Sequence, residues 1–109
     1  MSIATAQAKV EALLNPRNVV IVGASDAPAS WAMRAFQNLK RYEFPGAVYP
    51  FNPRRDQVWH QRCYRSFDEL PEPPDHVLVV IPAPHVPDTL RAAAKAGAQN
   101  IEQQRFRVG

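Results

Sequence analysis

Cysteine and long apolar runs are scarce in this sequence, and each shortage excludes a class of protein. Cys63 is the single cysteine among 109 residues, so the chain cannot form an internal disulfide. No apolar run approaches the roughly 20 residues that a membrane-spanning helix needs, and the first residues lack the pattern of a signal peptide. We therefore expect a cytoplasmic protein that does not associate with membranes.

Patterns for catalysis and metal binding are missing as well. Gly23 is followed by Ala24 and Ser25 without the second glycine that the nucleophile turn of a serine hydrolase requires. His60 and Cys63 are too few for a zinc site, which takes three or four ligands. The sequence therefore predicts neither a catalytic residue nor a metal site.

The positive charge is concentrated in the middle of the chain. The formal net charge is +3, and between Arg34 and Arg65 seven basic residues outnumber two acidic ones. Such a region raises the encounter rate with a small polyanion, although a solvated basic face would look the same. Nucleic acid is not expected, because aromatic residues are not interleaved with the basic ones and no nucleic-acid-binding motif is present.

One strand and the turn after it form the centre of the predicted fold. Residues 19–22 are four β-branched residues in a row, which indicates a strand buried on both faces, as in a parallel sheet covered by helices. Gly23 permits a tight turn, and Ala24 and Ser25 leave room for a ligand. Ser30 then caps a helix, whose N-terminus and free amides favour an anion. An ordinary turn without a ligand is the alternative interpretation.

The rest of the chain alternates between strands and helices. Further strands are predicted at 47–52, 76–81 and from 100–101 onward, with a short extended piece at 58–59. Pro50 lacks an N–H donor, so the strand at 47–52 should lie near an edge of the sheet. The predicted helical segments are residues 3–14, the helix capped by Ser30 with Ala32, Ala35, Phe36 and Leu39 inward, a capping-box turn at 66–70, and a helix from near Val86 to Gly97.

This alternation predicts an α/β fold of one small domain, a doubly wound parallel sheet. In such a sheet the ligand binds at the carboxyl ends of the strands, where the strand order reverses. The loops at residues 23–30, 52–55 and 81–84 should meet there. The last residues, 102–107, are too polar for a buried strand, so we expect the sheet to be truncated and the strand at Ile101 to form an edge.

The second of these loops helps to choose between nucleotides. An NAD site needs an acidic residue after the second strand, whereas this chain has Asn52, Pro53, Arg54 and Arg55. Arginine in this position favours a ribose that carries a phosphate, as in NADP or coenzyme A. Two solvated arginines are the simpler alternative.

Six short motifs together resemble a known family. They are LLNPR at 13–17, VGASD at 22–26, FPG at 44–46, YPFNP at 49–53, CY at 63–64 and IPA at 81–83. Over residues 13–101 the chain resembles the N-terminal CoA-binding domain of NDP-forming acyl-CoA synthetases, which are related to the succinyl-CoA synthetase α subunit. The resemblance implies a Rossmann-like fold that binds coenzyme A over residues 17–102, preceded by a helix and stop at 1–16 and followed by an unassigned tail at 103–109.

The resemblance also implies a set of ligand-binding residues. Gly23 and Ser25 would meet the phosphates, Arg54 would border the phosphate on the adenosine, and residues 81–83 would line the opposite wall. The full set of expected cofactor-binding residues is Gly23, Ala24, Ser25, Ser30, Asn52, Pro53, Arg54, Ile81, Pro82 and Ala83. The sequence departs from the family at Ala29 and Ala32, where other members often have glycine.

The implied function is a CoA-binding module, a part or a truncated copy of an NDP-forming acyl-CoA synthetase, that is not catalytic alone. In the family, the phosphorylated histidine, the second ligase domain and the nucleotide-grasping domain lie beyond the residues matched here. The implied partners are CoA or acyl-CoA, together with a second copy of the chain or a partner chain that carries the ligase domains. The alternatives are an NADP-binding oxidoreductase or sensor domain and a remnant kept only for protein interactions.

Overall fold

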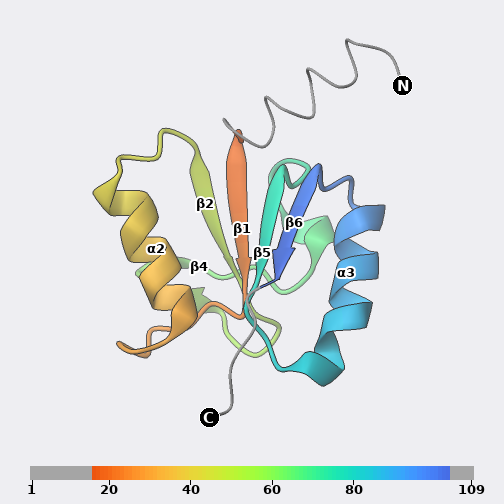
Figure 1. Ribbon diagram of the computed structural model, residues 1–109, viewed down its shortest axis with the longest axis horizontal. Coiled ribbons are helices and arrows are strands. Elements are labelled where there is room, and N and C mark those ends of the chain that lie inside the picture. Colours follow the sequence, from red (N-terminus) through yellow and green to blue (C-terminus); the bar gives the residue numbers. More distant parts are fainter. Residues whose placement is uncertain (1–15, 104–109) are drawn as a thin grey trace.

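A four-stranded parallel sheet in the order β2-β1-β5-β6 forms the centre of the molecule (Figure 1). Its strands are β1 (Asn18–Val22), β2 (Ala47–Phe51), β5 (His76–Val79) and β6 (Asn100–Gln103). This computed structural model describes residues 16–103, without the side chain of Ala83. The helix predicted at 3–14 and the tail after residue 103 lie outside the described residues.

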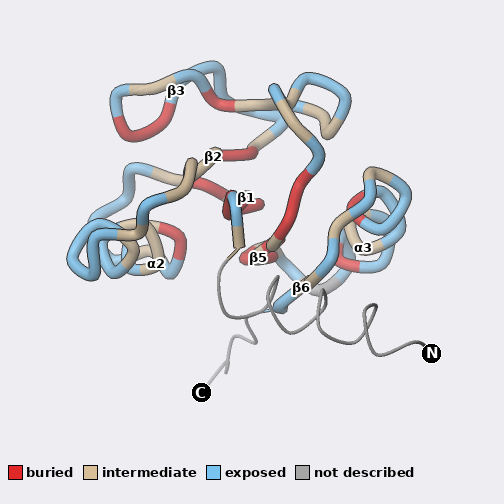
Figure 2. The backbone as a smooth tube through the Cα atoms, turned by 90° about the horizontal axis from the view of Figure 1, so that it is seen from above, coloured by how far each residue is buried: buried red, intermediate tan, exposed pale blue. Residues whose placement is uncertain are grey.

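β1 is the central strand, and all five of its residues are buried. Val19 and Ile21 belong to one apolar cluster and Val20 and Val22 to another, because successive side chains point to opposite faces of the sheet. Helix α2 (Trp31–Arg41) packs on the first face and α3 (Val86–Lys95) on the second (Figure 2). The prediction of a strand buried on both faces is therefore confirmed.

The strand order reverses between β1 and β5. From β1 the chain passes through α2 to β2 on one side, and from β5 it passes through α3 to β6 on the other. This topology confirms the predicted α/β, Rossmann-like, doubly wound sheet in a small domain. No helix within residues 16–103 is long and apolar enough to cross a membrane.

The two edge strands of the sheet, β2 and β6, are those that the sequence predicted. β2 is an edge strand, as Pro50 predicted, and Pro50 lies opposite Ile21 in the register. At the other end β6 pairs with β5, and among the described residues no strand pairs with the free side of β6. β5 ends at Val79, two residues earlier than predicted, although the Val80 N–H still donates to the Val22 carbonyl at 2.8 Å.

A small hairpin after β2 was not predicted. It consists of β3 (Gln57–Val58) and β4 (Gln61–Arg62), which pair antiparallel around the two turn residues Trp59 and His60. The φ angles of Trp59 and His60 are 56° and 60°, as the central residues of a type I′ turn require. The prediction that Trp59 belongs to an extended piece is therefore wrong. The sequence did not reveal the turn, because glycine and asparagine, the residues that normally mark it, are absent at 59 and 60.

Two helix-end predictions had different outcomes. The turn at 66–70 exists as the 3-10 helix η1 (Phe67–Glu69), but the Ser66 side chain makes no capping bond. The Glu69 carboxylate instead accepts from the Arg65 N–H at 3.1 Å, so the capping-box prediction is wrong. Helix α3, preceded by the 3-10 helix η2 (Ala83–His85), ends before Gly97, whose φ of +95° confirms the predicted stop.

A polar network joins the amino ends of the strands. The buried Asn18 side chain donates to Glu72 at 2.8 Å and accepts from the Asp75 N–H at 2.8 Å. The Tyr49 hydroxyl donates to the other oxygen of the Glu72 carboxylate at 2.6 Å. These bonds hold the proline-rich connector at 71–74 against β1 and β2, so the connector covers part of the sheet without regular structure.

Candidate functional site

The three predicted loops meet at the carboxyl ends of β1, β2 and β5. The Asn52 side chain, at the end of β2, donates to the Ala24 carbonyl at 3.0 Å. On the other side of the turn, a Cβ atom added to Gly23 would lie 2.1 Å from the carbonyl oxygen of Val80. The loop after β1 is thus in direct contact with the loops after both neighbouring strands, as the strand order predicted.

The first amides of the turn are used by the fold. The N–H groups of Gly23 and Ala24 both donate to the Phe51 carbonyl, at 2.9 and 3.2 Å. The Ala24 side chain is completely buried in the same apolar cluster as Ala32. These two amides are therefore not available to an anion, because the turn packs tightly against the end of β2. A ligand contact at Ala24 stays a prediction.

The next two amides of the loop are available. Within the described residues, neither the Ser25 N–H nor the Asp26 N–H donates a hydrogen bond. No acidic residue lies in the first turn of α2, so the helix dipole favours an anion where the same loop meets the helix. The candidate anion site consequently lies two residues further along the loop than the amides of Gly23 and Ala24.

Both serines of the loop have structural partners. The Ser30 hydroxyl oxygen accepts from the Met33 N–H at 3.0 Å and so caps α2, as predicted. The Ser25 hydroxyl oxygen accepts from the Ala27 N–H at 3.1 Å. Each hydroxyl keeps its own O–H as a donor, so both serines remain able to contact a ligand.

The second loop combines a fixed asparagine with exposed cations. The Asn52 side-chain oxygen accepts from the Arg54 N–H at 3.0 Å, in addition to the bond that its amide nitrogen makes with Ala24. Pro53, Arg54 and Arg55 are exposed, and neither arginine forms an ion pair within residues 16–103. Asn52 therefore shapes the loop, while the two arginines carry positive charge that a ligand can meet.

The third loop supplies an apolar side chain and a helical turn. Ile81 is half-buried, and its Cγ2 atom would lie 3.0 Å from a Cβ atom on Gly23. Pro82 is exposed, and its carbonyl accepts from the His85 N–H at 3.0 Å at the start of η2. The side chain of Ala83 lies outside the description. Ile81 thus lies beside the turn of the first loop, and its role in lining a ligand stays a prediction.

The sequence indicated only a short extended piece at 58–59 and did not reveal the contacts of Trp59 with the first loop. The Trp59 indole N–H donates to the Ser25 carbonyl at 3.0 Å, and its backbone N–H donates to the Asp26 carboxylate at 2.8 Å. The ring stacks on Phe36 of α2, with 4.2 Å between the ring centroids and an interplanar angle of 6°. The turn between β3 and β4 brings these groups together, and no sequence motif predicts this turn.

The cysteine near the site is not activated. Cys63 is buried, and its Sγ atom lies 3.8 Å from the Asn52 carbonyl oxygen. Burial raises the pKa of the Cys63 thiol, so the thiolate that would act as a nucleophile is disfavoured. Among the described residues no group of three or more histidine, cysteine or acidic side chains could hold a metal ion.

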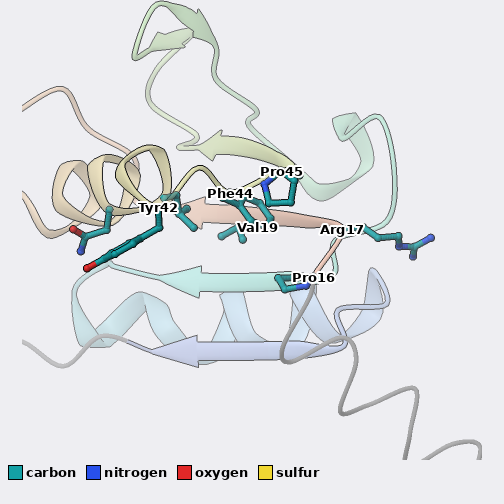
Figure 3. Close-up of a pocket in the computed structure, with 9 residues that line it drawn as sticks. Pro16, Arg17, Val19, Tyr42, Phe44 and Pro45 are labelled. Carbon is teal, nitrogen blue, oxygen red and sulfur yellow. The ribbon is translucent and has the colours of Figure 1, made fainter.

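Two open grooves lie on the α2 side of the sheet, the larger away from these loops and the smaller beside Val80 and the start of α2. One, with a volume of about 690 Å³, lies at the amino ends of the strands and is lined by Arg17, Val19, Tyr42 and Phe44, among others (Figure 3). A smaller one of about 330 Å³ lies between α2 and β5 beside Leu78. Neither groove is lined by a predicted ligand-binding residue, so the candidate site is defined by its loops and charges.

The comparison with protein families decides the identity of this fold. A family model described as a CoA binding domain matches residues 17–105. The chain belongs to the CoA-binding domain family. The predicted resemblance to NDP-forming acyl-CoA synthetases is confirmed by this match together with similarity to ADP-forming acetate–CoA ligases.

The first relative is a trans-feruloyl-CoA synthase of an unknown prokaryotic organism, 39% identical over 89 residues. The second is the α subunit of the ADP-forming acetate–CoA ligase II of Pyrococcus furiosus, 34% identical over 87 residues. These matches cover 82% and 80% of this chain. The chain spans only 13% and 19% of the length of these relatives, so the CoA-binding domain corresponds to a small part of each.

Solved structures show the same domain in large and small chains. The dinucleotide-forming acetyl-coenzyme A synthetase 1 of Ca. Korarchaeum cryptofilum, in complex with phosphate and ADP, is 32% identical, with a TM-score of 0.75. The match covers 82% of this chain and 19% of that one. A conserved hypothetical protein from Pyrococcus furiosus is also 32% identical, with a TM-score of 0.71, and the match covers 81% of this chain and 74% of that one.

Proposed function

We propose that this chain binds CoA or acyl-CoA at the carboxyl ends of β1, β2 and β5, as one domain of an NDP-forming acyl-CoA synthetase. The observation that carries the proposal is the family match over residues 17–105, on a sheet whose ligand loops meet at the point of strand-order reversal. In a CoA ligase, coenzyme A is a substrate of the reaction and not strictly a cofactor.

The described residues fit the phosphate groups of such a ligand. The N–H groups of Ser25 and Asp26 have no acceptor within residues 16–103, and a diphosphate could occupy them. Arg54 or Arg55 would pair with the phosphate on the ribose, because both guanidinium groups are exposed and lack an acidic partner within the described residues. Residues 81–83 would border the ligand on the side of β5.

The proposal includes partners, because the described residues contain no assembled catalytic group. The ligase chemistry would require the domains that make up the rest of the relatives' length. Within residues 16–103 no strand pairs with the free side of β6, and such an edge suits a strand from a partner chain or a second copy. The cytoplasmic location expected from the sequence belongs to the same proposal.

Calorimetric titration of the chain with CoA, dephospho-CoA, NADP and NAD tests this function. We expect CoA to bind more tightly than dephospho-CoA, which lacks the phosphate on the ribose. The Arg54→Ala variant should weaken CoA binding by about 1 to 3 kcal/mol, the range for a charge-assisted hydrogen bond, and should remove part of the preference over dephospho-CoA.

Arg41→Ala is the matched control for Arg54→Ala. It also removes one exposed arginine, but from the last turn of α2 at the opposite end of the sheet, so CoA affinity should stay unchanged. Tighter binding of NADP than of CoA would favour the oxidoreductase or sensor alternative. Absence of binding to all four nucleotides would support a role in protein interactions alone.

A further inference from the structure

Two consecutive peptide groups of the β1–α2 loop are held by side chains from other segments. The carbonyl of Ala24 accepts from the Asn52 side chain at 3.0 Å, and the carbonyl of Ser25 accepts from the Trp59 indole at 3.0 Å. In a trans peptide the carbonyl and the following N–H point in opposite directions. The Ser25 N–H is therefore directed away from Asn52, and the Asp26 N–H is directed away from Trp59.

Trp59 is itself held in place by several contacts. Its side chain stacks on Phe36 and is buried, with 8% of the residue exposed. Its backbone has a φ of 56°, a conformation that costs energy for a residue with a Cβ atom and persists only where surrounding contacts impose it. The backbone N–H of Trp59 also binds the Asp26 carboxylate, which keeps that negative charge on the side of the hairpin.

We propose that Trp59 is a positioning residue for the ligand phosphates, acting through the peptide group between Ser25 and Asp26. The β3–β4 hairpin presents the indole N–H to the Ser25 carbonyl, and this bond orients the Asp26 N–H as an anion donor. Two successive amides oriented in this way form the kind of concave donor site that binds phosphate. The inference rests on the proposed function, because it names how the CoA loop is held.

The Trp59→Phe variant tests the role of the indole N–H. Phenylalanine keeps an aromatic ring for the stack on Phe36 but cannot donate to Ser25. Without this bond the Asp26 N–H is no longer oriented toward the charged phosphate. We expect the CoA affinity measured by calorimetry to fall about tenfold, the effect of losing that one hydrogen bond. In ¹H–¹⁵N spectra the Asp26 amide resonance should shift on addition of CoA to the unchanged chain, and should shift much less in the variant.

Tyr49→Phe is the matched control. It also removes one hydrogen-bond donor from a packed aromatic ring, but in the middle of β2, where Tyr49 contacts Glu72. It should lower the free energy of unfolding without changing the affinity for CoA. An equal loss of CoA affinity in both variants would mean that Trp59 acts only through stability, and would overturn the proposal.

The outcomes separate this proposal from the proposed function. Failure of the unchanged chain to bind CoA would overturn both. CoA binding with equal affinity and an equal Asp26 shift in Trp59→Phe would overturn only the role of Trp59. Should Trp59→Phe fail to fold, spectra of the unchanged chain decide the question. Shifts of both the Trp59 indole and the Asp26 amide resonances on addition of CoA support the proposal, and CoA binding without a shift of the Asp26 amide overturns it.

Discussion

At the residue scale, Gly23 shows how a position in a ligand loop can be determined by the fold. Its φ is +95°, and a Cβ atom there would lie 2.1 Å from the carbonyl oxygen and 2.9 Å from the carbonyl carbon of Val80. Since those atoms belong to the backbone of the neighbouring strand's end, they cannot rotate away. The glycine is therefore needed for the contact between the ends of β1 and β5, before any ligand is considered.

Substitution of Gly23 should consequently reduce stability as well as binding. We expect Gly23→Ala to lower the free energy of unfolding by about 2 to 5 kcal/mol, the combined cost of the left-handed backbone and of overpacking, and Gly23→Val to lower it further. Urea unfolding followed by circular dichroism measures this loss.

Gly97→Ala is the control for the overpacking part of that loss. Gly97 has the same φ of +95°, but nothing lies within 4 Å of a Cβ atom added there. Its loss should be about 1 kcal/mol, from the backbone conformation alone. Equal losses at positions 23 and 97 would show that the contact with Val80 is unimportant.

At the scale of elements, the β3–β4 hairpin is small but supports the first loop of the candidate site. Only Gln57–Val58 and Gln61–Arg62 pair, so the strands themselves contribute little stability. The contacts of Trp59 with Ser25, Asp26 and Phe36 instead attach the hairpin to the first loop and to α2. The turn residues remain in a conformation that favours glycine.

His60 provides a way to measure the strain in that turn. Its φ is 60° and its side chain is exposed, so His60→Gly should raise the free energy of unfolding by about 1 kcal/mol. Gln57→Gly, at an exposed position in the extended strand β3, should lower it instead, because glycine has no advantage there. Thermal melts of the two variants measure both effects, and a destabilised His60→Gly would contradict this account of the turn.

At the scale of the whole molecule, the two ends of the sheet have different tasks. The carboxyl ends carry free amides and exposed arginines, whereas the amino ends are joined by the network of Asn18, Tyr49, Glu72 and Asp75. Hydrogen bonds from Tyr49 and Asn18 lower the pKa of the Glu72 carboxyl. Burial, followed by the bond to Glu72, raises the pKa of Tyr49 to about 12.

These pKa shifts predict how stability depends on pH. The pKa of Glu72 is lower in the folded chain, so its contribution is present above the ordinary pKa of a glutamate and is lost as the pH falls through the folded value. The pKa of Tyr49 is higher in the folded chain, so its contribution is present below the ordinary value near 10 and is lost as the pH rises toward about 12.

Urea midpoints measured across the pH range test both steps. Glu72→Gln should weaken the loss at acid pH, and Tyr49→Phe should weaken the loss at alkaline pH, because each variant removes one titrating group. An unchanged alkaline loss in Tyr49→Phe would assign that step to other groups.

Much of this protein followed from local features of the sequence. The β-branched run at 19–22 can only be a strand buried on both faces, Ser30 caps α2 through its own hydroxyl, and Gly97 ends α3. Pro50 placed β2 at an edge because it lacks an N–H donor. The alternation of these elements was sufficient for the doubly wound fold, and the combination of short motifs was sufficient for the CoA-binding family.

Only the tertiary structure decided which groups of the loops remain free for a ligand. The Phe51 carbonyl accepts from the N–H groups of Gly23 and Ala24. The side chains of Asn52 and Trp59 donate to the carbonyls of Ala24 and Ser25. These partners lie 27 to 34 residues from the atoms they bind and belong to two other segments of the chain. Local sequence cannot determine such bonds, because they depend on which strands become neighbours and on the unusual turn that carries Trp59.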